Sequence, residues 1–225
     1  MTEVVVFIPV LNRPQRVKPL IESLEASLSS KVTARPVFIC SPDDDAEIAA
    51  VRAIDLEPLI VEWQPGRGDY AKKMNHAWRH TDEEFVFLGA DDLVFHPDWF
   101  DAALRVHRDL HPCVIGTNDM GNARVMAGRH STHTLVHRAY GECGTVDDPT
   151  VLLHEGYDHN FVDDEFIQTA MWRETYAFAV DARIEHFHPD WGKGTVDETY
   201  EKGKRHFGMD SELFHLRVRL WSNQR

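Results

Sequence analysis

Two adjacent carboxylates, Asp91 and Asp92, follow the apolar run Phe85–Leu88 after Gly89 and Ala90. The run has the composition of a buried strand, and open α/β sheets bind ligands at the carboxyl ends of their strands. Carboxylate oxygens are hard donors that suit Mg²⁺ or Mn²⁺. One of the two acids could instead cap the helix that is expected to begin near Pro97. The pair is therefore a candidate metal site whose role depends on what else reaches it.

A second acidic group, Asp163, Asp164 and Glu165, stands at the start of a helix expected from about residue 164 to 173. A carboxylate in this position could act as a general base and take the proton of an attacking hydroxyl group. The alternative is that one of these acids caps the helix by accepting hydrogen bonds from its free amide groups. One cap would still leave another acid available for chemistry.

Histidines supply further candidate ligands, but the chain has 14 of them, so each one alone is weak evidence. His186 and His188 are one residue apart, and in a strand such side chains point to opposite sides. We therefore do not expect both to bind one ion, and His186 is interpreted as structural. His130, His133 and His137 have no cysteine or HExxH context that would indicate zinc. We interpret them as polar loop or strand residues, some of them near an acceptor.

The elements that must position these groups alternate between strands and helices over the first 110 residues. Near-continuous apolar runs indicate strands that are covered on both faces, at residues 4–10, 36–40, 58–63 and 85–88. Apolar residues at helical spacing indicate a helix from about residue 12 to 28, and further helices are expected to end near residues 54 and 79. This alternation predicts a mostly parallel, doubly wound sheet.

The second half of the chain has a different rhythm, with more Gly, Asn, Ser, Thr and His. We expect a helical tail from about residue 196, with Leu213, Leu216 and Leu220 at compatible spacing. Strands are expected near residues 132–136, 176–180 and 183–187. The sequence contains no internal repeat or low-complexity linker, so residues 1–225 are predicted to form one domain. Its nucleotide-binding half would be about residues 1–112 and its acceptor half about 113–225.

Composition excludes several classes of protein. The net charge of −13 disfavours general DNA binding, which relies on Lys and Arg to neutralise phosphates. No apolar run approaches the roughly 20 residues that a transmembrane helix needs. The N-terminus lacks the basic segment of a secretory signal, and the three cysteines are widely spaced without a CxxC pair. We therefore expect a cytoplasmic protein.

Four segments should meet at one edge of a parallel sheet, because each follows the carboxyl end of a strand. They are residues 9–13, 41–45, 65–73 and the pair Asp91 and Asp92. Together they offer carboxylates for a metal ion, cations for phosphates, and hydrogen-bonding groups for a base and a ribose. A nucleoside diphosphate needs this combination.

The order of motifs IPVLNRP, SPDDD, GRGDYAKKMNHAW, FLGADDLVFHPDW, DDEF and EHFHPDWGKG resembles family 2 glycosyltransferases with the GT-A fold. The resemblance covers most of the chain, from about Val4 to Gly194. It implies a Rossmann-like, mostly parallel α/β sheet flanked by helices, with a smaller mixed C-terminal half on the acceptor side. It also implies that a sugar is transferred, with inversion, from a nucleoside-diphosphate sugar with the help of Mn²⁺ or Mg²⁺.

The resemblance also implies which residues bind the nucleotide. Arg67 and Lys73 would lie near the diphosphate and Asn75 near the ribose, although Lys72 and Lys73 could equally form a solvated helix face. The acidic loop departs from the family pattern, because Ser41 takes the place directly after the strand. The complete set expected at the donor is Pro9, Arg13, Ser41, Asp43, Asp44, Arg67, Lys73, Asn75 and Asp91.

The metal motif departs from the family pattern as well. Many relatives have Asp-x-Asp, and Gly89 stands where the first of these acids would be. Either Asp91 or Asp92 could then be the direct ligand, and we expect one on the metal and the other on the ribose or on a metal-bound water. His188 resembles the family's C-terminal metal-binding histidine. By the same resemblance, Asp163 or Asp164 is the favoured general base and Glu165 the third candidate.

Two other functions stay open at this stage. A non-catalytic module that binds a nucleotide or nucleotide sugar would be consistent with the missing acid at Gly89. A nucleotidyltransferase is disfavoured, because Asn12, Arg13 and Pro14 follow the first strand in place of a Gly-rich phosphate loop. The sequence does not specify the donor. The acceptor is equally open among a glycan, a lipid-linked sugar, a protein side chain and a modified nucleic acid.

Overall fold

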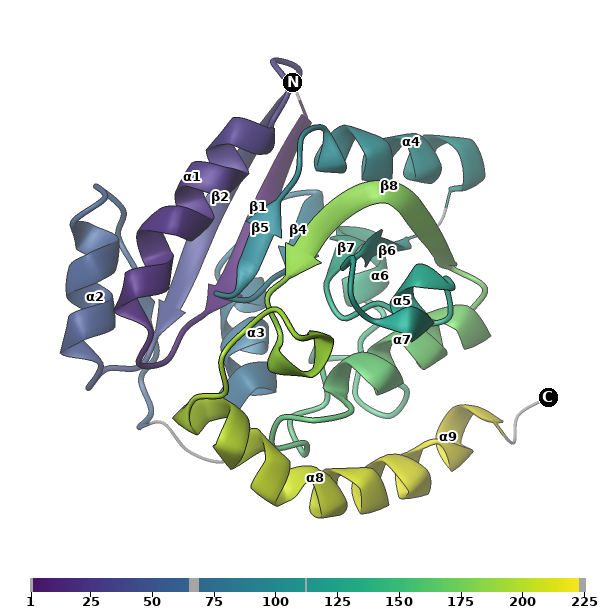
Figure 1. Ribbon diagram of the computed structural model, residues 1–225. Coiled ribbons are helices and arrows are strands. Elements are labelled where there is room, and N and C mark those ends of the chain that lie inside the picture. Colours follow the sequence, from purple (N-terminus) through teal and green to yellow (C-terminus); the bar gives the residue numbers. More distant parts are fainter. Residues whose placement is uncertain (1, 65–68, 112, 223–225) are drawn as a thin grey trace.

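The computed structural model describes residues 2–64, 69–111 and 113–222, whose arrangement is shown in Figure 1. Among these residues the strands are β1 (Thr2–Pro9), β2 (Val32–Cys40), β3 (Leu59–Ile60), β4 (Phe85–Leu88), β5 (Leu93–Phe95), β6 (Val114–Asn118), β7 (Thr134–His137) and β8 (Tyr176–His186). The helices are α1 (Val17–Ser27), α2 (Asp45–Arg52), α3 (Asp69–Arg79), α4 (Trp99–Leu110), α5 (Ala123–Met126), α6 (Arg138–Gly141), α7 (Val162–Trp172), α8 (Glu198–Arg217) and α9 (Arg219–Ser222). Two short 3-10 helices are η1 (Pro14–Arg16) and η2 (Pro189–Trp191).

The strands form one sheet in the order β3-β2-β1-β4-β7-β6-β8-β5. In the first half, β1 pairs in parallel with both β2 and β4, and β2 pairs in parallel with β3. Helices α1, α2 and α3 connect these strands in turn. The doubly wound arrangement predicted for the first 110 residues is confirmed.

The second half of the sheet is mixed. β7 runs antiparallel to its neighbours β4 and β6, whereas β6 pairs in parallel with β8. β8 is one continuous strand that arches over the molecule in Figure 1, where two strands were expected. Val180 and Asp181 near its middle are exposed, which breaks the apolar pattern. A register shift opposite Thr117 and Asn118 lets the strand continue through this point.

Strand β5 is three residues long and was missed, because so short a segment shows no periodicity. It runs antiparallel to β8, with Leu93 opposite His186. Next to this pair, the amide of Phe187 donates to the carbonyl oxygen of Asp92 (2.9 Å). The pairing therefore brings a carboxylate that follows β4 against a histidine that ends β8.

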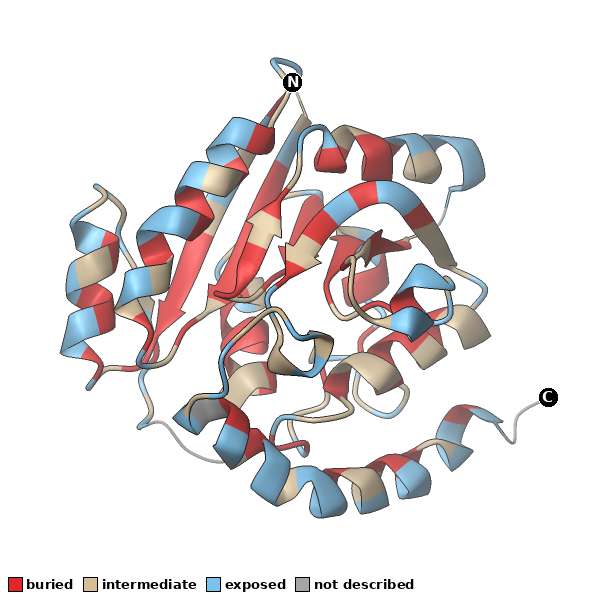
Figure 2. Cartoon of the chain, in the orientation of Figure 1, coloured by how far each residue is buried: buried red, intermediate tan, exposed pale blue. Residues whose placement is uncertain are grey.

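Strand β1 supplies apolar side chains to both faces of the sheet, as its uninterrupted apolar run predicts. Val4, Val6 and Ile8 pack with helices α1, α2 and α4, whereas Val5 and Phe7 pack with α3 and α7. All five side chains are fully buried, and the central strands are accordingly red in Figure 2. The carboxyl end of β1 is therefore held rigidly from two sides.

Helix α8 is the long tail helix that lies along the lower edge of the molecule in Figure 1. Its buried side chains include Tyr200, Asp210, Phe214 and Arg217. The predicted helix is confirmed, but its apolar face is not the predicted one, since Leu216 is 62% exposed. Among the described residues, no helix is long and apolar enough to cross a membrane.

Candidate active site

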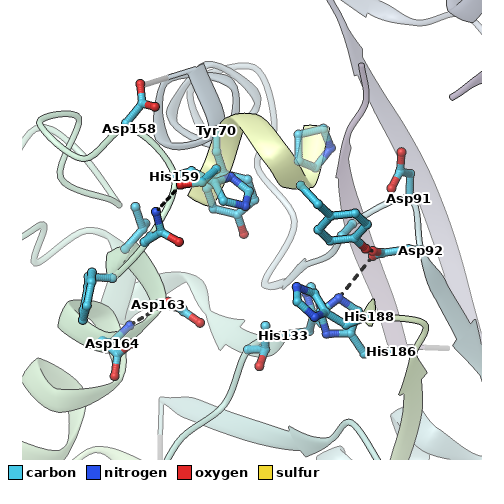
Figure 3. A pocket seen from close by; sticks show the side chains of 18 of the residues that line it. Tyr70, Asp91, Asp92, His133, Asp158, His159, Asp163, Asp164, His186 and His188 are labelled. Carbon is cyan, nitrogen blue, oxygen red and sulfur yellow. Dashed lines mark hydrogen bonds and ion pairs between the residues drawn. The ribbon is translucent and has the colours of Figure 1, made fainter. Parts of the chain in front are cut away.

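A cavity of about 490 Å³ lies at the carboxyl ends of β1 and β4. Parts of three of the four segments predicted to converge line it: residues 9–13, 69–73 and 90–92. Its opposite wall comes from residues 158–164, and Tyr200, Gly203 and Phe207 of α8 close one side. Figure 3 shows Asp163 and Asp164 across the cavity from Asp91 and Asp92. Arg67 lies outside the described residues.

The loop at 41–45 does not reach the cavity in the part of the chain that is described. The Asp44 carboxylate accepts from the backbone amides of Asn12 (2.7 Å) and Glu47 (3.2 Å) instead. Asp43 is exposed, and Ser41 is fully buried. The structure therefore does not bring Ser41, Asp43 and Asp44 to the predicted nucleotide pocket. The loop instead binds the backbone of Asn12 on the side away from the cavity.

Glu47 provides the second support behind this loop. Its Oε2 accepts from the backbone amide of Arg13 (2.8 Å), and the side chain is fully buried. Burial is the main reason that the pKa of Glu47 is raised to about 7; the hydrogen bond from the Arg13 amide opposes this shift, and the charges of Asp44 and Asp91 add to it. A carboxyl group that is partly protonated at neutral pH thus lies directly beneath the cavity floor.

Arg13 and Pro9, both expected at the donor, line the cavity. The Arg13 guanidinium donates to Asp91 Oδ1 (2.9 Å) and, through two nitrogens, to both carboxylate oxygens of Asp197 (2.8 Å each). It also lies 4.7 Å from the ring centre of Tyr200. This buried cation ties the carboxyl end of β1 to the segment that enters α8.

Asp91 and Asp92 point to different partners. Asp91 accepts a hydrogen bond from Arg13 (2.9 Å), and Arg16 lies between the two acids, 3.6 Å from Asp91 and 3.5 Å from Asp92. Asp92 faces β8: its Oδ2 accepts from the Tyr200 hydroxyl, and its Oδ1 lies 3.4 Å from His186 Nε2. Burial works against ionisation of Asp92, but His186 and Tyr200 outweigh it and hold its pKa below the usual range. Of the two acids, Asp92 is the one that faces the cluster of histidines.

Asp92, His133 and His186 form a buried group whose possible ligand atoms all lie within 4.8 Å of one another. Within the described residues, Asp92 Oδ1 and His133 Nε2 have no hydrogen-bond partner. Burial and the nearby His186 lower the pKa of His133 to about 3, so its ring is neutral, which is the form that binds metals. One carboxylate and two imidazoles fit a divalent cation.

His186 and His188 do not point to opposite sides, and that expectation is wrong. Their ring centres are 5.1 Å apart and both line the cavity. The alternation of a strand stops at His186, where β8 ends, and the chain turns into η2 immediately after His188. His188 Nδ1 accepts from the Asp190 amide (3.2 Å), and the metal-ligand role of His188 stays a prediction.

Lys73 lines the cavity and is only 3% exposed, so it does not belong to a solvated helix face. Its ammonium donates to the carbonyl oxygen of Val10 (2.7 Å) and lies 3.3 Å from Asp69. Asn75 is structural: its amide donates to Leu153 O (2.8 Å) and its carbonyl oxygen accepts from Leu153 N (2.9 Å). The unfavourable Asn in a helix did indicate a role, but the role is to anchor a distant loop.

Asp163 and Asp164 line the cavity, whereas Glu165 does not. Both carboxylate oxygens of Glu165 accept from Arg217 (2.7 Å each), and one also accepts from the Tyr157 hydroxyl (2.7 Å). Glu165 is therefore a structural ion pair between α7 and the end of α8, and its inclusion among the candidate bases is corrected.

The two acids at the cavity have different partners. Asp163 Oδ2 lies 3.1 Å from His130 Nε2, and Asp164 Oδ1 accepts from Arg124 (2.6 Å). Burial opposes ionisation of Asp163, yet His130 lowers its pKa, and the two carboxylates raise the pKa of His130 against the effect of its burial. The N-cap of α7 is Phe161, and Asp163 Oδ1 accepts from the amide of Asp164 in the first turn (3.0 Å), which leaves Oδ2 toward His130.

Several residues at the site were not found from the sequence. Tyr200 lies 108 residues from Asp92 in the chain, and Asp197 lies 184 residues from Arg13. His133 was treated as a loop or strand residue, because no ligand spacing marks it. Only its position beside β4 in the folded sheet reveals it, and strand pairing of this kind leaves no local pattern.

Comparisons with known proteins were made for the whole chain. Residues 5–158 match the model of a family described as glycosyl transferase family 2. A search of curated proteins finds no match. Many solved structures have a similar fold.

Three of these structures illustrate the likeness. S. aureus TarS 1–349 is 16% identical, with 94% of this chain and 73% of that chain covered and a TM-score of 0.60. The mannosyltransferase PcManGT from Pyrobaculum calidifontis, in complex with GDP-Man and Mn²⁺, is 16% identical, with coverages of 96% and 69% and a TM-score of 0.63. Glucosyl-3-phosphoglycerate synthase from Mycobacterium tuberculosis, in complex with Mn²⁺, UDP-glucose and phosphoglyceric acid, is 14% identical, with coverages of 97% and 80% and a TM-score of 0.60. The expected GT-A type of α/β fold is confirmed.

Proposed function

The chain belongs to glycosyl transferase family 2, and from this premise we propose that it transfers a sugar from a nucleoside-diphosphate sugar to an acceptor hydroxyl group. The observation that carries the proposal is the arrangement of one cavity. Asp92, with two histidines beside it that could help to hold a cation, lies in one wall, and Asp163, a carboxylate beside His130, lies in the opposite wall. In an inverting displacement, the attacking hydroxyl and the leaving diphosphate lie on opposite sides of the sugar carbon. The base and the cation must therefore lie on opposite walls of the cavity.

The donor side is proposed to be the wall made by residues 9–13, Tyr70, Lys73 and the two acids after β4. A bound Mn²⁺ or Mg²⁺ at Asp92 would stabilise the charge that develops on the departing diphosphate. Asp91 is proposed to contact the ribose, with Arg13 holding its carboxylate in place (2.9 Å). The solved relatives in complex with GDP-Man or UDP-glucose support this assignment of the donor class.

The general base is proposed to be Asp163. Asp164 is held by Arg124, and Glu165 lies outside the cavity, whereas the charged partner of Asp163 at hydrogen-bond distance, within the part of the chain that is described, is His130. Its lowered pKa keeps it ionised at neutral pH, so it can accept the proton of the acceptor hydroxyl as that oxygen attacks. Attack from the wall opposite the leaving group gives inversion.

Gly89 does not support the alternative of a non-catalytic binding module. A Cβ atom at this position would lie 2.9 Å from the carbonyl oxygen of Phe7, and the Gly89 amide donates to the same oxygen (3.0 Å). The acid of the family pattern is therefore excluded by close packing of β4 against β1. Its absence is not evidence that catalysis has been lost.

Thermal-shift measurements test the proposal. The protein should be stabilised by UDP or GDP in the presence of Mn²⁺, and less without it, because a ligand that binds only the folded state raises its stability. CDP and dTDP complete the series, and the matching nucleotide sugar should then release its diphosphate when the protein is added. If no diphosphate raises the melting temperature with or without metal, the proposed donor site is wrong.

A further inference from the structure

We propose that Asp92, His133 and His186 together are the protein ligands of one divalent cation, and that this set selects first-row transition metals over Mg²⁺. The inference rests on the proposed function in placing an ion at Asp92, and it adds the identity of the ligands and the class of ion. His133 is the residue that decides both points.

His133 has the geometry of a ligand that is already oriented. Its Nδ1 lies 3.3 Å from the carbonyl oxygen of Leu88, which can only accept, so Nδ1 carries the proton. The lone pair of Nε2 therefore points away from Leu88 and, within the described residues, meets no hydrogen-bond donor. The residue is 5% exposed, so water does not readily satisfy this nitrogen. A buried acceptor without a hydrogen-bond partner destabilises the folded protein, and a bound cation would remove that cost.

Asp92, like His133, is oriented by one hydrogen bond and, among the described residues, keeps a second atom free to bind an ion. Its Oδ2 accepts from the Tyr200 hydroxyl, and its Oδ1 faces His186 Nε2 at 3.4 Å without forming a hydrogen bond. Two ligands at about 2.1 Å from one ion lie about 3–4 Å apart. The candidate atoms of the three residues, all within 4.8 Å of one another, can reach such positions by small side-chain rotations.

The backbone fixes the two strand ends that carry this group. Leu93 pairs with His186 across β5 and β8, and His133 immediately precedes β7, which pairs with β4. The rings of His133 and His186 meet edge to face, with their centres 4.8 Å apart. The ligand set is therefore assembled by sheet pairing, not by a flexible loop.

The donor types decide which ion is preferred. Imidazole nitrogens favour transition metals, whereas Mg²⁺ prefers oxygen ligands and gives up its water reluctantly. Among the described residues, Asp92 is the carboxylate that groups with the two histidines, whereas Asp91 accepts a hydrogen bond from Arg13 (2.9 Å). Affinity should rise from Mn²⁺ to Co²⁺, following the general order for nitrogen-containing sites, with Mg²⁺ far weaker.

Isothermal titration of the full chain with each metal chloride alone, without nucleotide, tests the inference. Co²⁺ should bind at least tenfold more tightly than Mg²⁺, with Mn²⁺ between them. His133→Asn should keep the hydrogen bond to Leu88 O but lose the ligand atom, and should weaken Co²⁺ binding at least tenfold. The control is His137→Asn. His137 is a partly exposed histidine at the end of β7 that contacts Glu84, and this variant should bind Co²⁺ as the wild type does.

A measurement on the wild type alone protects the test against a variant that fails to fold. Pulsed electron paramagnetic resonance of bound Mn²⁺ should show coupling to imidazole nitrogen. Equal affinities for Mg²⁺ and Co²⁺, no metal binding, or an unchanged Co²⁺ affinity in folded His133→Asn would each overturn the inference.

The outcomes also separate this inference from the proposed function. If UDP or GDP stabilises the protein with Mg²⁺ as well as with Co²⁺, the donor site stands and the selectivity is wrong. If Co²⁺ binds through His133 but no nucleoside diphosphate binds with any metal, the ligand set stands and the proposed donor is wrong.

Discussion

The Tyr200 hydroxyl donates a hydrogen bond to Asp92 Oδ2, and so connects helix α8 to the acid that follows β4, 108 residues earlier in the chain. Tyr200 also lies against the Arg13 guanidinium (4.7 Å) and the ring of His188 (4.8 Å). One aromatic side chain thus contacts three of the groups predicted to bind donor or metal. The orientation of Asp92 depends on a helix that shares no local sequence with it.

Removal of the Tyr200 hydroxyl should weaken metal binding without leaving a cavity, because the aromatic ring stays in place. In Tyr200→Phe, Asp92 loses one of its two nearest partners, and hydrogen bonds to charged groups contribute about 1.5–3 kcal/mol. We expect Mn²⁺ affinity to fall several-fold and the free energy of unfolding to fall by about 1–2 kcal/mol, measured by titration and by urea denaturation. The matched control is Tyr140→Phe, since the Tyr140 hydroxyl contacts Thr169 away from the cavity. Equal metal affinity in the two variants would show that Tyr200 does not orient Asp92.

Glu47 should make stability depend on pH. Burial raises its pKa from 4.5 to about 7, so the folded protein holds this proton more tightly than the unfolded chain. Stability from this group is therefore fully present below about pH 4.5 and is lost as the pH rises through about 7. At roughly 1.4 kcal/mol per pKa unit, the loss amounts to at most about 3.5 kcal/mol.

Glu47→Gln keeps the shape of the side chain and removes the titration. Urea unfolding from pH 4.5 to pH 8 should show the wild type losing stability relative to this variant as the pH rises. The exposed residue Glu25 gives the control Glu25→Gln, for which the difference from wild type should stay constant. A constant difference for Glu47→Gln too would mean that Glu47 is ionised in the folded protein throughout this range.

Asp163 should control transfer but not donor binding. Loss of a general base typically costs 10²–10⁴-fold in rate, so Asp163→Asn should reduce sugar transfer by that range and leave the thermal shift with nucleoside diphosphate and Mn²⁺ unchanged. Asp164→Asn is the matched control, because its carboxylate is held by Arg124 (2.6 Å), and its transfer rate should change far less. The base is assigned wrongly if the two variants show the opposite order.

His130 should determine the lowest pH at which transfer keeps its full rate, because it lowers the pKa of Asp163. The histidine lowers the pKa of Asp163, so the wild-type rate should hold at a pH below the ordinary range of an aspartate. In His130→Asn the positive partner is lost, and the acid limb of the pH–rate profile should move to higher pH while the plateau changes less. His137→Asn again serves as the control. An unmoved acid limb in His130→Asn would assign that limb to another group.

The sequence predicted the first half of the fold well, because buried parallel strands are uninterrupted apolar runs that can be recognised one at a time. It placed Asp91 and Asp92 correctly at a strand end, but it could not show that they face different partners. His133 and Tyr200 reach Asp92 only through pairing of β4 with β7 and packing of α8, and neither contact leaves a periodic pattern. The same limit explains Glu165, which looks like a third catalytic acid until its distant partner Arg217 is known.

Gly89 allows a last prediction, about the acid that many family members have at this point. The Cβ of any other residue would lie 2.9 Å from the Phe7 carbonyl oxygen, which belongs to the central strand and cannot move aside easily. Gly89→Ala should therefore destabilise the protein by about 1–3 kcal/mol, the usual cost of overpacking, and Gly89→Asp by at least as much. Gly208→Ala is the control, because a Cβ built at this exposed position of α8 has nothing within 4 Å. Urea denaturation measures the stabilities, and Mn²⁺ titration asks whether the new carboxylate adds a ligand. If Gly89→Asp were as stable as the wild type and bound Mn²⁺ more tightly, Gly89 would mark a lost ligand and the non-catalytic alternative would gain support.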